Sequence, residues 1–312
     1  MTAPTGAEHA GRWLAPGLGV TVEVPATSAN LGPGFDCFGL ALDWRERVEV
    51  EVIQSGYQLD VSGEGADQVP RDATHLIIRS LLAGLADLGV TAPGLRLTCR
   101  NTIPHGRGLG SSSAAIVAGL VAAQALAGQE IDRAWAVEQA DAIEGHPDNV
   151  AAAVYGGFVL AYHAQLGVRV VQGRLTEGLG AVLFVPTTPV ATSAARGLLP
   201  DRVPHAEAAA NAARAALLVH AMAADPGLLW EATRDWLHQD YRRSAMPPSY
   251  ELLRKLRAEG HAAVISGAGP TVLVLGRAVQ LGALRGWRVP GFRTASAAPG
   301  GAASVRKGHH AD

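Results

Sequence analysis

The sequence predicts a fold of mixed helices and strands in two domains, on three observations. The chain has 312 residues, a length that suggests two domains or one large one. Segments with the period-two alternation of strands are interspersed with longer apolar stretches typical of helices. After Phe158 the pattern changes to a new series of strands. We therefore expect one domain over residues 17–160, a second over residues 161–300, and flexible ends at residues 1–16 and 301–312.

The composition excludes several classes of protein. Hydrophobic residues make up 48% of the chain and charged residues 17%, which favours a packed core over disorder. The formal net charge of -2 gives no electrostatic reason to expect nucleic acid or an anionic membrane as a partner. The longest apolar run, near residues 114–127, is too short to cross a bilayer. We expect neither nucleic acid nor membrane binding.

The cysteines and the N-terminus favour a cytoplasmic protein. Cys37 and Cys99 are the two cysteines, too few for a disulfide framework, and their spacing is not that of a metal site. The first 16 residues contain no basic segment followed by an apolar one, so we expect no signal peptide. The oligomeric state stays open, and a homodimer is compatible with the sequence.

The first elements are strands around a long polar loop. Residues 25–36 are rich in glycine, proline and small polar residues, and loops of this kind usually carry function or a specific turn. Asn30 and Asp36 are its polar side chains, which either bind a ligand or complete the turn. The elements expected before residue 104 are strands over residues 20–24, 47–52 and 95–100 and a helix over residues 74–85.

A glycine-rich loop then leads into an apolar helix, and the remaining elements are arranged around it. The stretch reads Pro104, His105, Gly106, Arg107, Gly108, Leu109, Gly110, Ser111, Ser112, Ser113, Ala114. Glycines permit positive φ and a close approach of the backbone to a ligand, and the serines stand where a helix cap belongs. Free N–H groups and the helix dipole would make this place an anion site suited to phosphates.

Other interpretations of this loop remain. It would also serve as a flexible connection to a capped core helix. It is not a P-loop, because no lysine precedes the serines, and serines stand where a dinucleotide fingerprint needs glycine. The run from Gly110 to Ala114 resembles the nucleophile elbow of serine hydrolases with its last glycine replaced by alanine. A hydrolase using Ser112, His146 and Asp148 is therefore a second hypothesis.

The next helix, from Ile131, carries a candidate metal ligand. Its apolar positions include Trp135 and Ala142, and Glu138 falls on the same stripe, whereas Glu144 points elsewhere. A carboxylate that faces the core is costly unless it is paired or binds a metal. Glu138 is therefore either salt-bridged or a Mg²⁺ ligand near the phosphate loop.

A polar turn over residues 146–149 follows, and then the elements of the second domain. We expect strands over residues 158–162, 180–186, 262–266 and 271–275 and helices over residues 192–200, 206–224, 228–236 and 251–259. The Gly-Ala-Gly-Pro turn at 267–270 indicates tight packing or contact with a ligand.

Three motifs together resemble the GHMP small-molecule kinases. They are the loop at residues 25–36, the loop at residues 104–114 and the segment 266–270, and the resemblance runs from about Val20 to Leu275. Within that superfamily, the first motif and the Glu-Gly-His-Pro-Asp-Asn run at residues 144–149 are most similar to the homoserine kinases. The resemblance implies an α+β fold with a ribosomal-S5-domain-2-like N-terminal domain, a ferredoxin-like C-terminal domain, and an active site between them.

The resemblance also implies a reaction and its residues. ATP with Mg²⁺ would phosphorylate the side-chain hydroxyl of L-homoserine, in threonine biosynthesis. The stretch from Pro104 to Ala114 resembles the loop that holds the ATP phosphates, and Ser112 and Glu138 resemble the Mg²⁺ ligands. The residues that resemble the amino-acid site are Asn30, Asp36, His146, Arg196 and Arg242. A carboxylate suits the ammonium group of an amino acid, and paired arginines suit its carboxylate.

One departure from the wider superfamily concerns the catalytic base. Several relatives have an aspartate seven residues before the glycine pair that is Gly156 and Gly157 here, where this chain has Asn149. Asparagine cannot accept a proton, and the homoserine kinases share it. The resemblance therefore implies direct phosphoryl transfer without an aspartate base, with Asn149 among the catalytic residues. Alternatives are a superfamily kinase for mevalonate or a sugar, and a nucleotide-binding sensor without turnover.

Overall fold

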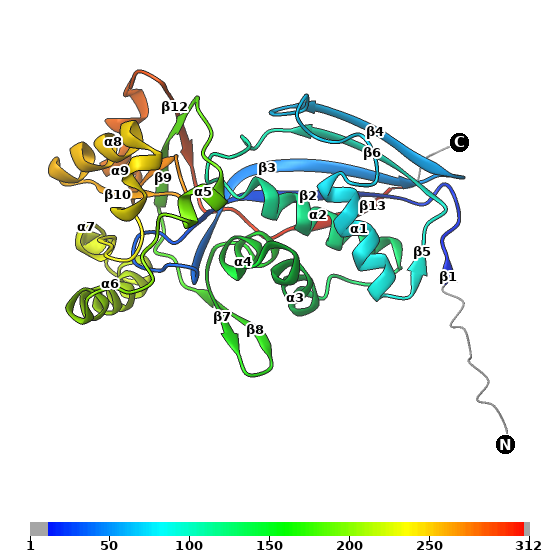
Figure 1. Ribbon diagram of the computed structural model, residues 1–312, viewed down its shortest axis with the longest axis horizontal. Helices are drawn as coiled ribbons and strands as arrows, with labels where there is room; N and C mark the ends of the chain where they lie inside the picture. Colours follow the sequence, from blue (N-terminus) through cyan, green and yellow to red (C-terminus); the bar gives the residue numbers. More distant parts are fainter. Residues whose placement is uncertain (1–11, 309–312) are drawn as a thin grey trace.

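The computed structural model describes residues 12–308, and it contains two β-sheets at opposite ends of an elongated molecule (Figure 1). Five strands form the main path of the first sheet, in the spatial order β13 (Ser304–Gly308), β2 (Gly19–Ala29), β3 (Phe38–Val52), β6 (Gly94–Asn101) and β4 (Gly56–Gly63). The hairpin of β7 (Phe158–Ala164) and β8 (Gly167–Gly173) joins this sheet along β3. A short parallel pair, β1 (Arg12–Trp13) with β5 (Val90–Thr91), stands apart.

Four helices cover one face of the first sheet: α1 (Leu76–Asp87), α2 (Ser111–Leu126), α3 (Arg133–Glu144) and α4 (Pro147–Tyr155). The helix α2 lies at the centre of this layer, and its residues from Ile116 to Leu126 are all buried. A helix that is apolar all round must be covered on every side, as α2 is by the sheet, α1, α3 and α4. A Cβ at Gly119 would lie 2.5 Å from the Ile77 carbonyl oxygen, so glycine lets α1 pack closely there.

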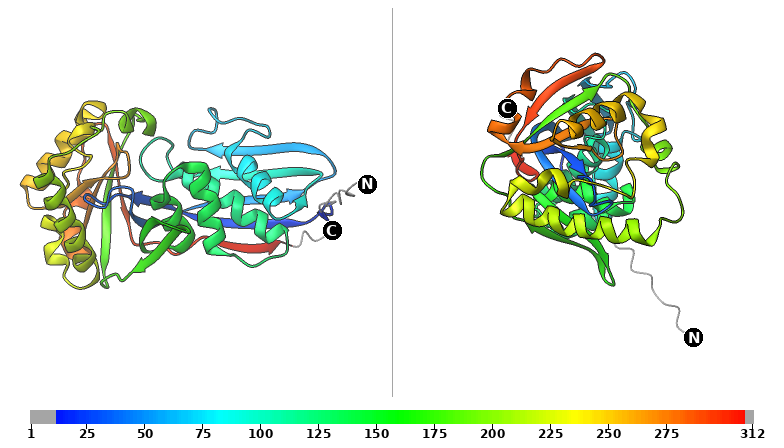
Figure 2. Two further views of the ribbon diagram at one scale, coloured as in Figure 1. Left: turned by 60° about the horizontal axis from the view of Figure 1, so that its bottom comes forward. Right: turned by 90° about the vertical axis from the view of Figure 1, so that its left-hand side faces the viewer.

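The second sheet has the order β10 (Ala262–Ile265), β11 (Val272–Arg277), β9 (Leu179–Pro186) and β12 (Phe292–Ala297), with antiparallel neighbours. An apolar cluster packs between these strands and the helix over residues 247–258, and it includes Phe184, Leu256 and Val274. The associated helices are α5 (Thr192–Arg196), α6 (His205–Ala223), α7 (Leu229–Ala232), α8 (Pro247–Ala258) and α9 (Ala278–Leu281). Figure 2 shows α6 to α8 packed beside this sheet. The predicted α+β architecture is confirmed.

The chain ends and the domain boundary differ from the prediction. Residues 304–308 are not a flexible end, because β13 pairs with β2 inside the first sheet. Residues 12 and 13 are likewise paired in β1, whereas the predictions for residues 1–11 and 309–312 lie outside the described residues. The proposed boundary at residue 160 falls within β7, and the first sheet continues to Gly173. The alternation of apolar and polar residues is weak in β8 and β13, so the sequence pattern did not predict these two strands.

Two local predictions were also wrong. The polar residues His146 to Asn149 do not form a separate turn, since His146 is the N-cap of α4 and Pro147 its first residue. The helix expected over residues 228–236 is reduced to α7, of four residues. Within residues 12–308, no helix has both the length and the apolar character needed to span a bilayer.

Candidate active site

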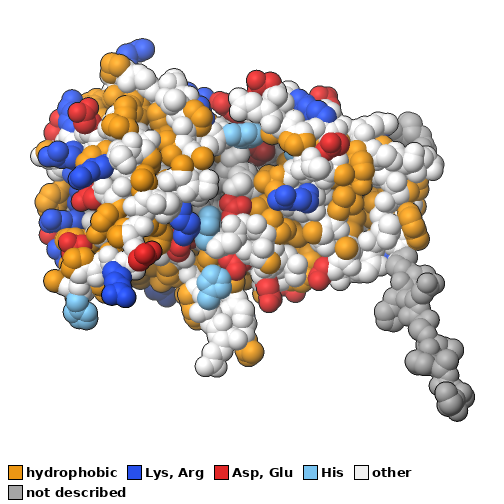
Figure 3. Space-filling model, in the orientation of Figure 1, with side chains coloured by type: hydrophobic (Ala, Val, Ile, Leu, Met, Phe, Trp, Pro, Cys, Tyr) orange, Lys and Arg blue, Asp and Glu red, His pale blue; other side chains and the backbone are white. Residues whose placement is uncertain are grey.

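A cavity of about 500 Å³ lies where the two parts of the molecule meet. In the space-filling view, histidine and acidic side chains gather along this boundary (Figure 3). The first part contributes the glycine loop, the start of α1 and the segment from Glu144 to Asn149, and the second part contributes Arg196, Arg242 and Gly267. Asn30 and Asp36, from the loop after β2, also line it. The sequence-predicted residues therefore meet in one cavity, apart from Glu138 and Ala114.

The glycine loop has the left-handed backbone that its sequence predicts. Gly106, Gly108 and Gly110 have φ of 65°, 71° and 68°. A Cβ at Gly108 would collide with the Ser266 carbonyl oxygen, and one at Gly110 with the Thr27 hydroxyl. The loop is thus packed against the second part of the chain at residues 266–269. At Gly108, only glycine fits without moving that backbone.

The start of α2 differs from the prediction in its cap. Gly110 is the N-cap, with no side-chain cap hydrogen bond, so the serines occupy the first helical turn. The N–H groups of this turn have no acceptor inside the helix, and they open toward the cavity that the serines line. The helix dipole adds partial positive charge there, which suits a phosphate group.

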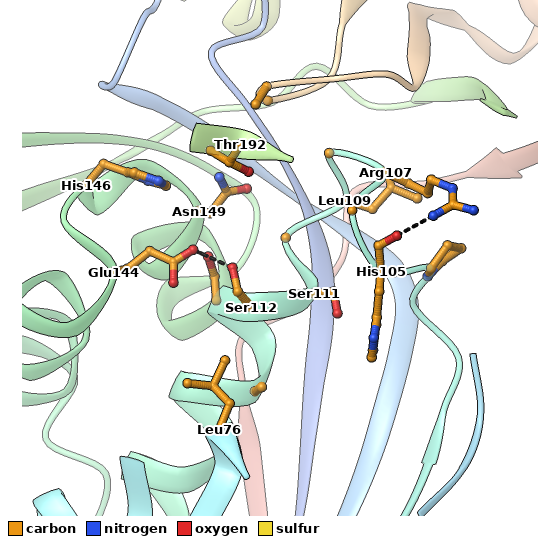
Figure 4. Close-up of a pocket in the computed structure, with 18 of the residues that line it drawn as sticks. Leu76, His105, Arg107, Leu109, Ser111, Ser112, Glu144, His146, Asn149 and Thr192 are labelled. Carbon is orange, nitrogen blue, oxygen red and sulfur yellow. Dashed lines mark hydrogen bonds between the residues drawn. The ribbon is translucent and has the colours of Figure 1, made fainter. Parts of the chain in front are cut away.

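The serine hydroxyls are bound to a carboxylate from α3. Ser112 Oγ donates to Glu144 Oε1 at 2.5 Å, and Ser113 Oγ donates to the same oxygen at 3.2 Å (Figure 4). The hydroxyl of Ser112 is therefore not paired with a histidine, as a hydrolase nucleophile would be. Its neighbour His146 is instead hydrogen-bonded to Asp148, Nδ1 to Oδ1, at 3.0 Å.

Glu144, rather than Glu138, stands beside Ser112, and the predicted apolar stripe of α3 was wrong. The buried residues of α3 are Ala136, Val137 and Ala140, while Glu138 is exposed. A Cβ at Gly167 would lie 3.1 Å from Glu138 Oε1, which places this carboxylate beside the β7–β8 hairpin. Glu144 follows Val137 by seven residues and Ala140 by four, so it shares the buried face and reaches the cavity.

Asn149 is held in place from two sides at the start of α4. Its Oδ1 accepts a hydrogen bond from the Thr27 hydroxyl at 2.7 Å, and its backbone N–H donates to Asp148 Oδ1 at 2.7 Å. Asp148 is buried, and its hydrogen bond to His146 raises the pKa of that imidazole. This network fixes the Asn149 side chain at the cavity wall close to the loop glycines.

An ion pair joins the loop after β2 to α5 at one end of the cavity. Arg196 donates from Nη1 and Nη2 to the two oxygens of Asp36, at 2.9 and 2.8 Å. Asn30 Oδ1 accepts from the Asp36 N–H at 2.9 Å, and Asn30 Nδ2 donates to the Gly267 carbonyl at 2.9 Å. Asn30 thus ties this loop to the second part of the chain and orients the Asp36 carboxylate.

Arg242 is a buried charge with weak partners. It is 2% exposed, its Nε has no partner within residues 12–308, and Nη1 makes only long contacts, to His238 Nδ1 and the Gly267 carbonyl at 3.3 and 3.4 Å. Burial and the nearby Arg196 lower the pKa of Arg242. The guanidiniums of Arg196 and Arg242 both lie over the Phe35 ring, at 5.6 and 5.3 Å from its centroid. Two like charges gathered around one ring favour an anion between them.

Comparison with known proteins agrees with this geometry. Residues 75–157 match the model of the GHMP kinases N terminal domain, and residues 206–284 match that of the GHMP kinases C terminal. The homoserine kinase of Streptomyces coelicolor is 54% identical over 82% of this chain and 84% of its own length. The chain belongs to the homoserine kinases. The homoserine kinase of Corynebacterium efficiens is 47% identical over 83% of this chain and 86% of its own length.

A solved homoserine kinase structure, from Cytophaga hutchinsonii, is similar over almost the whole chain. It superposes with a TM-score of 0.81 at 26% identity and covers 92% of this chain and 97% of the other. The fold assigned from the sequence motifs is therefore the fold of this kinase family.

Sequence reasoning missed several residues of this homoserine kinase family site. Glu144 and Phe35 are among them, and so are Glu46 and His75, buried side chains at another end of the cavity. Glu144 could have been found from the stripe through Val137 and Ala140. Glu46 lies in the alternating strand β3, on the face that carries valines. A charged residue among buried positions was the signal that could have identified it.

Glu46 should make the stability of the protein depend on pH. Burial raises the pKa of Glu46 to about 7 from 4.5. The native state then holds a proton that the unfolded chain releases, so stability falls as pH rises from 4.5 through 7. We expect the unfolding free energy of Glu46→Gln, relative to wild type, to rise by about 3 kcal/mol between pH 4 and pH 8. Urea unfolding at several pH values measures this difference, and parallel curves would contradict it.

Proposed function

We propose that this protein transfers the γ-phosphoryl group of ATP to the side-chain hydroxyl of L-homoserine, giving O-phospho-L-homoserine and ADP. One observation carries the proposal. The glycine loop with the first turn of α2, which suits phosphates, opens into the same cavity as Asp36, Arg196 and Arg242, which suit an amino acid. Membership of the homoserine kinases supports the same reaction.

The amino acid would be recognised through both of its charges. Its carboxylate fits between the guanidiniums of Arg196 and Arg242, where the geometry favours an anion. Its ammonium fits Asp36, which Arg196 holds in position. The short side chain then extends toward Asn149 and the phosphate loop, which brings the hydroxyl to the reacting phosphoryl group.

The residues at the phosphate loop fit a magnesium ion. Ser112 Oγ and Glu144 Oε1 are both oxygen donors and lie 2.5 Å apart, and Mg²⁺ commonly takes one or two protein oxygens and leaves the rest to phosphates and water. A bound Mg²⁺ would supply positive charge to the transferring phosphoryl group. The backbone N–H groups at the start of α2 add to that charge stabilisation.

Transfer would proceed without a protein base. The hydroxyl oxygen of homoserine forms a bond to the γ-phosphorus, the bond from that phosphorus to the bridging oxygen breaks, and ADP leaves. The hydroxyl proton passes to a phosphoryl oxygen or to solvent. Asn149 accepts from Thr27 through its Oδ1, and its Nδ2 donates a long hydrogen bond to Asp148 Oδ1 at 3.4 Å. One amide N–H is then left to orient an oxygen in the cavity.

A direct test of this mechanism is Asn149→Asp. We expect kcat to fall by roughly tenfold, because the new carboxylate adds charge beside Asp148 and opposite the phosphates. Steady-state kinetics with saturating ATP and homoserine measure the change. A large increase in kcat would instead mean that a base was needed and absent.

The proposed reaction is tested by ADP release. A coupled assay with Mg-ATP would compare L-homoserine, mevalonate, galactose and no acceptor. Turnover with homoserine alone supports the proposal. Mevalonate also carries a carboxylate that the arginines would accept, so turnover with it would retain the phosphate site and overturn the substrate assignment.

A further inference from the structure

A buried histidine lies behind Arg242, and the transfer reaction does not use it. His238 is fully buried and does not line the cavity. It precedes the short 3₁₀ helix Tyr241–Ala245, which contains Arg242, and the Arg242 N–H donates to the His238 carbonyl oxygen at 3.1 Å. Side chains four residues apart on a helical turn are neighbours, so the imidazole and the guanidinium lie side by side.

The partners of His238 fix which ring nitrogen carries the proton. Its Nε2 lies 2.8 Å from the carbonyl oxygen of Gly32, which can only accept, so Nε2 carries the hydrogen. Asp235 Oδ2 lies 3.6 Å from Nε2, too far for a hydrogen bond, and it accepts instead from the backbone N–H groups of His238 and Gln239. Burial and the nearby Arg242 lower the pKa of His238, so the ring is neutral near pH 7 and Nδ1 is an acceptor.

Arg242 turns one nitrogen of its guanidinium toward that acceptor. Nη1 lies 3.3 Å from His238 Nδ1 and 3.4 Å from the Gly267 carbonyl oxygen, and both side-chain hydrogen bonds of Arg242 within residues 12–308 leave from Nη1. Its Nε is buried and has no partner among the described residues. Nε and Nη2 form one edge of the guanidinium, with two parallel N–H donors that match the two oxygens of a carboxylate. The contacts of Nη1 therefore leave this edge for a ligand.

The other arginine at this end of the cavity has its paired donors occupied. Arg196 uses Nη1 and Nη2 for the two oxygens of Asp36. His238 also supports the ring that both arginines contact, because its imidazole stacks on Phe35 with the ring centroids 5.2 Å apart and an angle of 29° between the planes. Through Gly32 and Phe35 it holds the loop after β2, and through Nδ1 it holds Arg242.

We propose that His238 is a positioning residue for homoserine, which holds Nη1 of Arg242 with its unprotonated Nδ1 and so presents the Nε–Nη2 edge to the substrate carboxylate. The proposal deepens the proposed function, because it rests on a carboxylate substrate at Arg242. The alternative is a histidine that only supports the fold, in which case its replacement would lower stability and leave recognition of the substrate unchanged.

Two amide variants separate the two contacts of His238. In His238→Asn the amide oxygen is as many bonds from Cα as Nδ1 is, so an acceptor for Arg242 remains and the donor to Gly32 is lost. In His238→Gln the amide nitrogen matches Nε2, so the donor remains and the acceptor is lost. We expect His238→Gln to raise the KM for homoserine roughly tenfold and His238→Asn to raise it less than about twofold. In both variants kcat and the KM for ATP should stay close to those of wild type.

Steady-state kinetics and thermal melting of the full-length protein measure these effects, and Gln239→Met is the matched control. Gln239 belongs to the same turn, is buried and does not line the cavity, and its Oε1 accepts from the Ile265 N–H at 2.6 Å. Methionine leaves that buried N–H unpaired, so the melting temperature should fall while the KM for homoserine stays unchanged. Equal increases in KM in Gln239→Met and His238→Gln would overturn the proposal, because KM would then follow the stability of the turn.

A measurement on wild type covers the case in which His238→Gln does not fold. Neutron diffraction from crystals of the unaltered protein locates the imidazole proton. A proton on Nε2 and none on Nδ1 supports the proposal. A proton on Nδ1 overturns it, because that nitrogen could not then accept from Arg242.

Calorimetric titration with L-homoserine separates this proposal from the proposed function. Weaker binding to His238→Gln than to His238→Asn would support the positioning role even if no phosphoryl group were transferred, and the proposed reaction alone would fail. Equal binding of homoserine by the two variants, with normal turnover, would overturn the positioning role and leave the proposed reaction in place.

Discussion

Replacing Glu144 with glutamine should lower kcat for homoserine phosphorylation by roughly 100- to 1000-fold. Glu144 Oε1 lies 2.5 Å from the Ser112 hydroxyl at the start of α2, where we place the magnesium ion. An amide keeps the size of the side chain but loses the negative charge that a hard cation prefers. The Mg²⁺ concentration that gives half of the maximal rate should rise, and kcat should fall at the same time.

The matched control for this experiment is Glu138→Gln. Glu138 lies on the same helix, is exposed and does not line the cavity, so we expect no change in kcat or in the Mg²⁺ dependence. Circular dichroism shows whether both variants keep the fold. A loss of activity in Glu138→Gln with none in Glu144→Gln would restore the assignment made from the sequence.

The difference between these two glutamates shows what the sequence could and could not predict. The stretch of α3 contains small residues on several faces, and Ala134 and Ala142 are exposed although alanine counts as apolar. A stripe that consists of alanines and a partly exposed tryptophan therefore left the direction of the buried face uncertain by about 100° around the helix axis. The glycine loop was less ambiguous, since three glycines directly before a helix start indicate a backbone with positive φ, and all three have it.

Long-range pairing set the other limits. β13 lies beside β2 although their paired residues, such as Glu23 and Ser304, are more than 280 positions apart in sequence. The short length of β13 gives no periodic signal. Phe35 could not be recognised as the ring that holds Arg196 and Arg242, because those three residues come from separate elements. Local sequence patterns predicted the helices and the phosphate loop. Contacts between residues on opposite sides of the cavity could be inferred only from the resemblance to the kinase family or from the structure itself.

Replacing Arg242 with methionine should raise the KM for homoserine by roughly 100-fold and leave the KM for ATP unchanged. The reason is that Arg242 and Arg196 flank the position proposed for the substrate carboxylate. Methionine keeps much of the buried volume and removes the charge. The variant should still bind ATP, since Arg242 comes from the second part of the chain and not from the glycine loop.

The same variant should not lose stability, and this separates recognition from a structural role. Arg242 is buried with an unpaired Nε and long contacts from Nη1, so without substrate its charge is poorly compensated. We expect the melting temperature of Arg242→Met to equal or exceed that of wild type. The control is Arg243→Met, an exposed neighbour that should change neither property. A large drop in melting temperature with an unchanged KM for homoserine would show that Arg242 supports the fold and does not bind the substrate. We expect the reverse, because burying an uncompensated charge costs stability unless an anion binds to pair with it.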